Sequence, residues 1–202
     1  MNTNATQPFI VGIGGTAAQG SSTEQALSLA LATAEAAGAR TQLFGGEELL
    51  ALPHYVPGKV AHGSNGQALI DAVRNANGLI IASPGYHGTI SGLVKNAIDY
   101  LEETAKDERV YLDGLPVGLI ATAYGWQATG GTLGALRSIV HALRGWPTPM
   151  GAAINTSGGI FFEGACQNEA AANQLRLVGL QVVEFATSSA HYALQSMSTK
   201  NA

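Results

Sequence analysis

The sequence has little charge and no cluster of basic residues. Charged residues make up 12% of its 202 residues, and ten Lys and Arg against fourteen Asp and Glu give a formal net charge of -4. Because no basic run and no basic-aromatic pattern occurs, we expect no nucleic acid partner. Hydrophobic residues reach 46%. Much of the secondary structure should therefore be buried on more than one face or in a subunit contact, and we expect a homodimer or homotetramer.

Cysteine and long apolar runs are also scarce. Cys166 is the only cysteine, so the chain cannot form an internal disulfide, and we expect it in the reducing cytoplasm. No uninterrupted apolar run reaches the roughly 18 residues of a membrane span. The first residues, MNTNATQPF, lack the charged start and apolar stretch of a secretion signal, so we expect no membrane contact. His54 and His62 share a loop without a third ligand, and we predict no metal site.

Short apolar runs alternate with helical patterns along the chain. The apolar runs predict five strands, FIVGIG, TQLFG, GLIIAS, LPVGLIATA and PMGAAINT. Helical periodicity predicts helices that begin near Ser22, Gly66, Gly92, Gly131 and Gln167. Continuous apolar strands between helices are typical of a parallel sheet covered on both faces. We therefore predict one α/β domain over residues 1–202, a flavodoxin-like three-layer sandwich with a five-stranded parallel sheet.

Three loops of this sheet predict a binding site. In open parallel sheets, ligands bind beyond the carboxyl ends of the strands. The loops after Ile13, Ala82 and Ala121 follow such ends and are rich in Gly, Ser and Thr. We expect these three loops to converge on one site.

The first loop contains GIGGTA, which matches the dinucleotide pattern G-x-G-x-x-G/A. In a true fingerprint the helix opens within the glycines, whereas here helical sequence begins only near Ser22, where Ser21 with Glu24 or Ser22 with Gln25 can form a capping box. A loop this long favours a single phosphate, bound by backbone N–H groups, hydroxyls and the helix dipole. The candidate donors are Thr16, Ser21, Ser22 and Thr23. Alternatively, the serines only cap the helix and the glycines only turn the chain.

The second and third loops carry aromatic residues among small ones. Pro84 has no N–H to donate, so we expect the strand to end there and the small residues after it to leave room for a flat ring. Tyr86 can stack on an aromatic ligand or plug the loop, and His87 can contact a ligand or stay exposed. Tyr124 and Trp126 can close over a flat ligand or pack against a neighbouring subunit.

A longer motif spans the second loop and the helix after it. Its residues spell P-x-Y-x-G-x-x-S-G-x-x-K-N-x-x-D from Pro84 to Asp99, and LPHYVP is similar to a second motif, L-P-x-Y-x-P. This pattern resembles the NADPH-dependent FMN reductase family, over most of the chain from the first strand through TGGTLGALRSIVHAL. The resemblance implies a flavodoxin-like fold, a dimer or tetramer, FMN as cofactor and NADPH or NADH as hydride donor.

The resemblance also implies which residues bind the cofactor. The phosphate loop of the family falls on Gly15, Thr16, Ser21 and Thr23. Its flavin-ring loop falls on Pro84, Gly85, Tyr86 and His87, and its third loop falls on Thr122, Ala123, Tyr124 and Gly125. Ala18 stands where the family often has an arginine, so backbone and hydroxyl donors would bind the phosphate.

Hydride transfer between nicotinamide and flavin needs two aligned rings rather than a catalytic side chain. The sequence has no convincing Ser-His-Asp or paired-carboxylate arrangement, and we predict no catalytic residue. We predict an FMN-dependent NAD(P)H oxidoreductase, a flavin reductase that releases reduced FMN to another enzyme, such as a monooxygenase, or reduces a small electron acceptor. The alternatives are a quinone, azo-dye or metal-ion reductase that retains FMN, a flavodoxin-like electron carrier, and a scaffold that has lost flavin.

Overall fold

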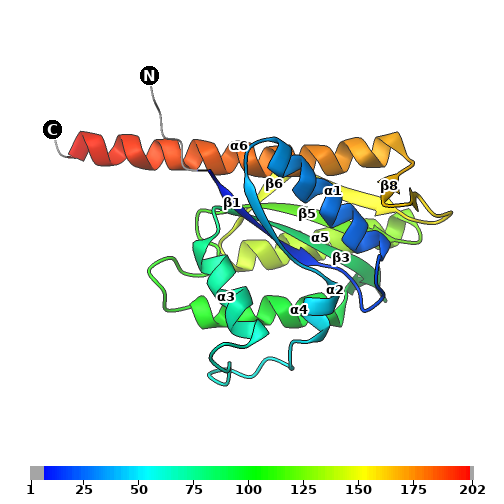
Figure 1. The fold of residues 1–202 in the computed structure, drawn as a ribbon, viewed down its shortest axis with the longest axis horizontal. Coiled ribbons are helices and arrows are strands. Elements are labelled where there is room, and N and C mark those ends of the chain that lie inside the picture. The colour runs from blue at the N-terminus through cyan, green and yellow to red at the C-terminus, as the bar shows by residue number, and fades with distance from the viewer. Residues whose placement is uncertain (1–6, 201–202) are drawn as a thin grey trace.

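The central sheet joins five parallel strands in the order β2-β1-β3-β5-β6 (Figure 1). The computed structural model describes residues 7–200, and the surroundings of side chains as far as residue 189. The strands are β1 Phe9–Gly14, β2 Arg40–Phe44, β3 Gly78–Tyr86, β5 Pro116–Ala123 and β6 Trp146–Asn155. All of β1 and most of β3 and β5 are buried, as strands with helices over both faces should be. The predicted flavodoxin-like sandwich is confirmed.

Helices cover both faces of this sheet (Figure 1). On one face, α1 (Ser22–Ala36) and α6 (Glu169–Lys200) bury an apolar core that includes Leu27 and Val178. On the other face, a second core includes Leu69 and Leu136. Its helices are α3 Asn65–Asn75, α4 Gly92–Asp99 and α5 Trp126–Ala142, with the short α2 Gly46–Leu50 and the 3-10 helix η1 Tyr100–Thr104. Within residues 7–200, no helix combines the length and apolar character needed to cross a bilayer.

The prediction that the third strand ends at Pro84 is wrong. Pro84 pairs in parallel register with Thr122 of β5, and β3 continues to Tyr86. Proline removes only a donor, so its carbonyl oxygen still accepts hydrogen bonds. The chain then turns back through His87 and Gly88, whose φ angles are 50° and 91°, into the antiparallel β4 (Thr89–Ile90). Two positive φ angles are typical of a two-residue hairpin turn, so the predicted open loop is a hairpin.

Other elements differ from the prediction by a few residues. α5 begins at Trp126 instead of near Gly131, because two glycines in its first turns conceal the helical pattern. Gly125 provides the break before it, with a φ of 116°. A small hairpin of β7 (Phe161–Phe162) and β8 (Ala165–Cys166) follows β6 and was not predicted. Both changes lie at the carboxyl end of the sheet.

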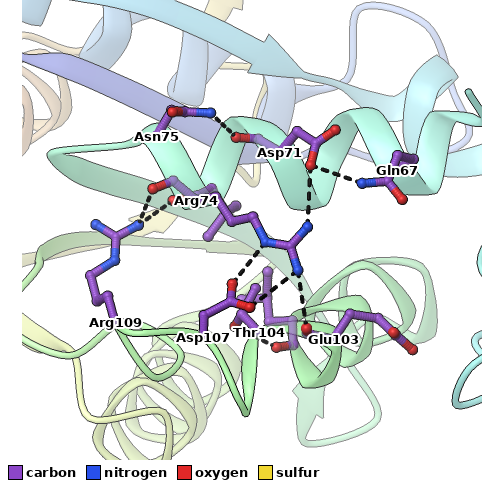
Figure 2. A network of polar contacts seen from close by, with 10 residues as sticks. Gln67, Asp71, Arg74, Asn75, Glu103, Thr104, Asp107 and Arg109 are labelled. Atoms are coloured by element: carbon purple, nitrogen blue, oxygen red, sulfur yellow. Dashed lines mark hydrogen bonds and ion pairs between the residues drawn. The ribbon is translucent and has the colours of Figure 1, made fainter. Parts of the chain in front are cut away.

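A polar network fastens the segment after η1 to the end of α3 (Figure 2). The Arg109 guanidinium donates to the backbone carbonyls of Ala76 at 2.7 Å, Val73 at 2.6 Å and Arg74 at 2.8 Å. The last carbonyls of a helix have no hydrogen-bond donor within the helix, and here the Arg109 guanidinium is their donor. Burial lowers the pKa of Arg109. Arg74 itself pairs with Asp107, with 2.7 Å between Nε and Oδ2.

Candidate functional site

A cavity of about 510 Å³ lies at the carboxyl ends of β1, β3, β5 and β6. Its size falls within the range of about 300–1,000 Å³ that is usual for small-molecule sites. The three loops predicted to converge do converge on it, and none of its lining residues carries a charged side chain. Ten of the thirteen predicted site residues line this cavity, and they come from all three loops.

The first loop contributes hydroxyls beside the start of α1. Thr16, Ser21, Ser22 and Thr23 all line the cavity, together with Gly20. The Ser21 side chain caps α1 by accepting from the backbone N–H of Glu24 at 3.3 Å, as predicted. The reciprocal half of a capping box does not form, because the Glu24 carboxylate accepts from the backbone N–H of Gly46 at 2.8 Å instead. Within the described residues, the Ser22 hydroxyl has no protein partner.

A buried hydroxyl pair joins the first and third loops. The side-chain oxygens of Thr23 and Thr122 lie 2.6 Å apart, and either can be the donor. Thr23 is 2% exposed and Thr122 is 3% exposed, yet both residues line the cavity. The hydrogen bond connects the first turn of α1 to the end of β5.

The second loop provides one wall of the cavity. Pro84, Gly85 and Tyr86 line the cavity at the end of β3. A Cβ atom on Gly85 would lie 2.6 Å from Thr132 Oγ1 and 3.2 Å from Ala123 Cβ, so only glycine fits this wall. The Ser83 hydroxyl holds the hairpin behind it, since it donates to the Pro84 carbonyl at 2.9 Å and accepts from the Ser91 N–H at 3.0 Å.

The third loop adds a second wall and an exposed aromatic ring. Ala123 and Tyr124 line the cavity, and Tyr124 is 83% exposed. Tyr86 on the opposite loop is 52% exposed. Two tyrosines with accessible rings therefore come from different loops of the same cavity. Trp126 is exposed at the first turn of α5 and does not line the cavity, so its part in a lid or a subunit contact stays a prediction.

Three predicted site residues lie outside the cavity lining. Gly15 packs behind the first loop, where a Cβ atom would lie 2.7 Å from the backbone nitrogen of Gly46. His87 is exposed in the hairpin turn. Gly125 turns the chain into α5, and its N–H donates to Asn155 Oδ1 at 3.1 Å. All three shape the loops of the site without lining it.

Three lining residues were not predicted, namely Gly20, Ala128 and Thr156. Thr156 directly follows β6, so the rule that ligands bind beyond the carboxyl ends of parallel strands applies to it as well. Ala128 lies in the first turn of α5, and the predicted late start of that helix hid it. Gly20 directly precedes Ser21 and Ser22. Its position beside these two predicted residues was the sequence signal that could have identified it.

Much of the motif from Pro84 to Asp99 builds structure around the cavity. Asn96 clamps the LPHYVP loop, since its side chain accepts from the Tyr55 N–H at 2.9 Å and donates to the Pro53 carbonyl at 2.9 Å. The Ser91 hydroxyl caps α4 by accepting from the backbone N–H of Val94. In this chain Asn96 thus links the longer motif to the LPHYVP loop.

This strand order, with a ligand-sized cavity at the carboxyl edge, defines a flavodoxin-like protein. The family model described as NADPH-dependent FMN reductase matches residues 8–159. The chain belongs to this family.

Sequence relatives include two FMN-dependent NADPH-azoreductases. The protein from Staphylococcus saprophyticus is 38% identical over 86 residues, which cover 43% of this chain and 42% of that protein. The protein from Staphylococcus haemolyticus is 34% identical over 87 residues, 43% of each chain. The chain thus matches less than half the length of these curated relatives.

Solved structures extend the likeness over nearly the whole chain. FerB from Paracoccus denitrificans, a flavoenzyme NAD(P)H:(acceptor) oxidoreductase, matches with a TM-score of 0.72 and 19% identity, over 90% of this chain and 98% of that one. The apo form of an NADH:FMN oxidoreductase (EMOB) matches with a TM-score of 0.66 and 23% identity, over 90% of each chain. At these identities, the likeness demonstrates the shared fold.

Proposed function

We propose that the protein is an FMN-dependent NAD(P)H oxidoreductase whose cofactor lies in this cavity. One observation carries the proposal: a hydroxyl-rich helix start and a wall that includes Tyr86 and Tyr124 meet in one cavity of about 510 Å³ without charged lining residues. Those two ends match the two parts of FMN, an anionic phosphate and a flat ring. Membership of the FMN reductase family supports the same assignment.

The phosphate end would rest on neutral donors. Thr16, Ser21, Ser22 and Thr23 bring hydroxyls to the amino-terminal end of α1, where unpaired N–H groups and the helix dipole favour an anion. Ala18 supplies no positive charge, and backbone donors can bind phosphate without one. The ionic strength of the solution should therefore affect FMN binding only weakly.

The ring end would rest on Pro84, Gly85, Tyr86, Ala123 and Tyr124. Bound FMN would supply the redox chemistry, since flavins take up hydride from nicotinamides. The protein contributes binding and orientation, and the glycine at position 85 lets this wall pack closely against Thr132 of α5. Tyr86 and Tyr124 can shield the reacting face from water.

The electron acceptor distinguishes two candidate functions. We propose first a flavin reductase that releases reduced FMN to a second enzyme such as a monooxygenase. The second candidate is an azo-compound reductase that retains FMN, and the similarity to the two staphylococcal FMN-dependent NADPH-azoreductases favours it. Gel filtration after turnover separates the two, since only the second leaves FMN with the protein.

We also propose that residues 1–202 form one domain that works in the cytoplasm as a homodimer or homotetramer. A groove between α4 and α5 offers a mixed surface for a second subunit, since the apolar Ile98, Ile139 and Leu143 line it together with the charged Lys95, Asp99 and Glu102. Light scattering of the pure protein tests the assembly. A monomer at micromolar concentration contradicts it.

A visible spectrum tests the cofactor and the activity together. Purified protein is titrated with FMN and then given NADH and, separately, NADPH without oxygen. We expect bleaching of the flavin band at about 450 nm, and we expect the rate of bleaching to differ between NADH and NADPH. Tight FMN binding without bleaching would instead support an electron carrier, and failure to bind FMN would overturn the proposed function.

A further inference from the structure

The Thr23–Thr122 pair holds one hydrogen that the protein leaves unused. A threonine hydroxyl has one hydrogen to donate and two lone pairs that accept. The two hydroxyls share a single hydrogen bond of 2.6 Å, which uses one of their two hydrogens. Across the described part of the chain, neither hydroxyl has a further protein partner.

The second hydrogen needs an acceptor that these two side chains do not provide. Both side chains are at least nine-tenths buried, and a buried donor without an acceptor is unfavourable. Both residues line the cavity, so a ligand bound there can reach this pair. A ligand that presents an oxygen acceptor at this place would complete the pair.

The two threonines differ in what surrounds them. Thr23 lies in the first turn of α1, where the helix dipole favours negative charge. Thr122 lies in β5 and pairs with Pro84 on one side and with Ile154 on the other. The hydroxyl of Thr23 is therefore the better placed of the two to donate to an anion.

We infer that Thr122 is a positioning residue that acts through Thr23. Its hydroxyl donates to the Thr23 oxygen, and the Thr23 hydroxyl then donates to a phosphate oxygen of the bound flavin nucleotide. Successive hydrogen bonds of this kind polarise and strengthen one another. The inference rests on the proposed FMN binding. Thr122, which the sequence assigned to the third loop of the cofactor site, would therefore act at the phosphate end of the cavity.

Two flavins that differ only in the phosphate group test this assignment. FMN and riboflavin are titrated into wild-type protein and into the variants Thr122→Val, Thr122→Ser and Thr23→Val, with flavin fluorescence as the readout. Valine keeps the shape of threonine without the hydroxyl. We expect the FMN dissociation constant of Thr122→Val to rise about tenfold while that for riboflavin changes less than about twofold. Thr122→Ser should restore FMN binding, and Thr23→Val should repeat the FMN-selective loss.

Three results would overturn the inference. These are unchanged FMN binding by Thr122→Val, an equal loss for FMN and riboflavin, or a Thr122→Ser protein as weak as Thr122→Val. Thermal unfolding of each variant shows whether it folds. If Thr122→Val does not fold, the FMN and riboflavin affinities of Thr23→Val and Thr122→Ser are compared with those of wild type instead. Wild-type protein that binds neither flavin would overturn the proposed function and the inference with it. That failure is visible in the wild-type titration alone.

Discussion

The Glu24 carboxylate accepts a hydrogen bond from the backbone N–H of Gly46 at 2.8 Å. Glu24 lies in the first turn of α1, and Gly46 is the first residue of α2. The bond therefore ties the start of α1 to the start of α2, next to the first loop. Gly15 fits into the same contact, because a Cβ atom there would lie 3.1 Å from Glu24 Oε2. The shape of the phosphate end depends on this junction as well as on the hydroxyls that line it.

Replacing Glu24 with alanine should destabilise the protein and weaken FMN binding. A hydrogen bond to a charged acceptor contributes about 1.5–3 kcal/mol, and partial exposure reduces it, so we expect a loss of about 1–2 kcal/mol in the free energy of unfolding. Glu24→Gln is the matched control, because its amide oxygen can still accept from Gly46. Urea denaturation measures both variants. Equal stability of Glu24→Ala and wild type would show that the junction holds without this bond.

Replacing Gly85 with alanine should damage the ring end of the cavity. The new Cβ atom would lie 2.6 Å from Thr132 Oγ1, so either the wall or α5 must shift. Overpacking of this kind costs about 1–3 kcal/mol, and we expect FMN affinity to fall by at least about fivefold. Gly92→Ala is the control, since a Cβ atom at Gly92 meets nothing within 4 Å. A flavin titration in which both variants match wild type would contradict this account of the wall.

The fold was predictable mainly because its three central strands, β1, β3 and β5, are largely apolar runs. Val11, Ile80 and Ile120 are completely buried in the three central strands, and such runs between helices leave few alternatives to a parallel sheet. The loops were predictable for the same reason, since the carboxyl ends of adjacent parallel strands meet at one edge. The apolar strands and their parallel arrangement thus predicted where the site lies.

The details of the site depend on contacts that sequence patterns do not contain. Gly15 has the same residue type as the cavity glycines, and only the approach of Gly46 places it behind the loop. His87 follows Tyr86 directly, but the tight turn directs it to solvent. The bond between Thr23 and Thr122 joins residues that are 99 positions apart. No local pattern predicts such a pair.

Replacing Arg109 with lysine should destabilise the end of α3. The guanidinium donates to three backbone carbonyls at once (Figure 2 shows two of these bonds), and an ammonium group cannot reproduce this planar geometry. We expect a loss of about 1–3 kcal/mol in the free energy of unfolding, with amides of α3 exchanging faster in hydrogen-exchange experiments. Lys106→Arg, on the same segment, is a control for the charge type. Unchanged exchange in α3 would contradict the capping role.

Tyr55 should make the stability of the protein depend on pH in the alkaline range. Burial, and then the hydrogen bond from its hydroxyl to Glu103, raise the pKa of Tyr55 from 10.0 to about 12. Because the folded pKa lies above the unfolded one, the stabilisation is complete below pH 10 and is lost as the pH rises toward about 12. Tyr55→Phe removes the hydrogen bond, and we expect it to cost about 1 kcal/mol at neutral pH.

The difference in stability between wild type and Tyr55→Phe should therefore shrink as the pH rises from about 10 to about 12. Urea denaturation at several pH values measures it, and phenolate absorbance near 295 nm follows the ionisation itself. Tyr124→Phe removes an exposed phenol elsewhere and should leave the pH dependence in place. A difference that stays constant up to pH 12 would mean that Tyr55 ionises equally in the folded and unfolded chains. The anchor between the LPHYVP loop and η1 would then owe its strength to Asn96 and to the packing of Tyr55 on Tyr100, whose ring centroids lie 5.3 Å apart.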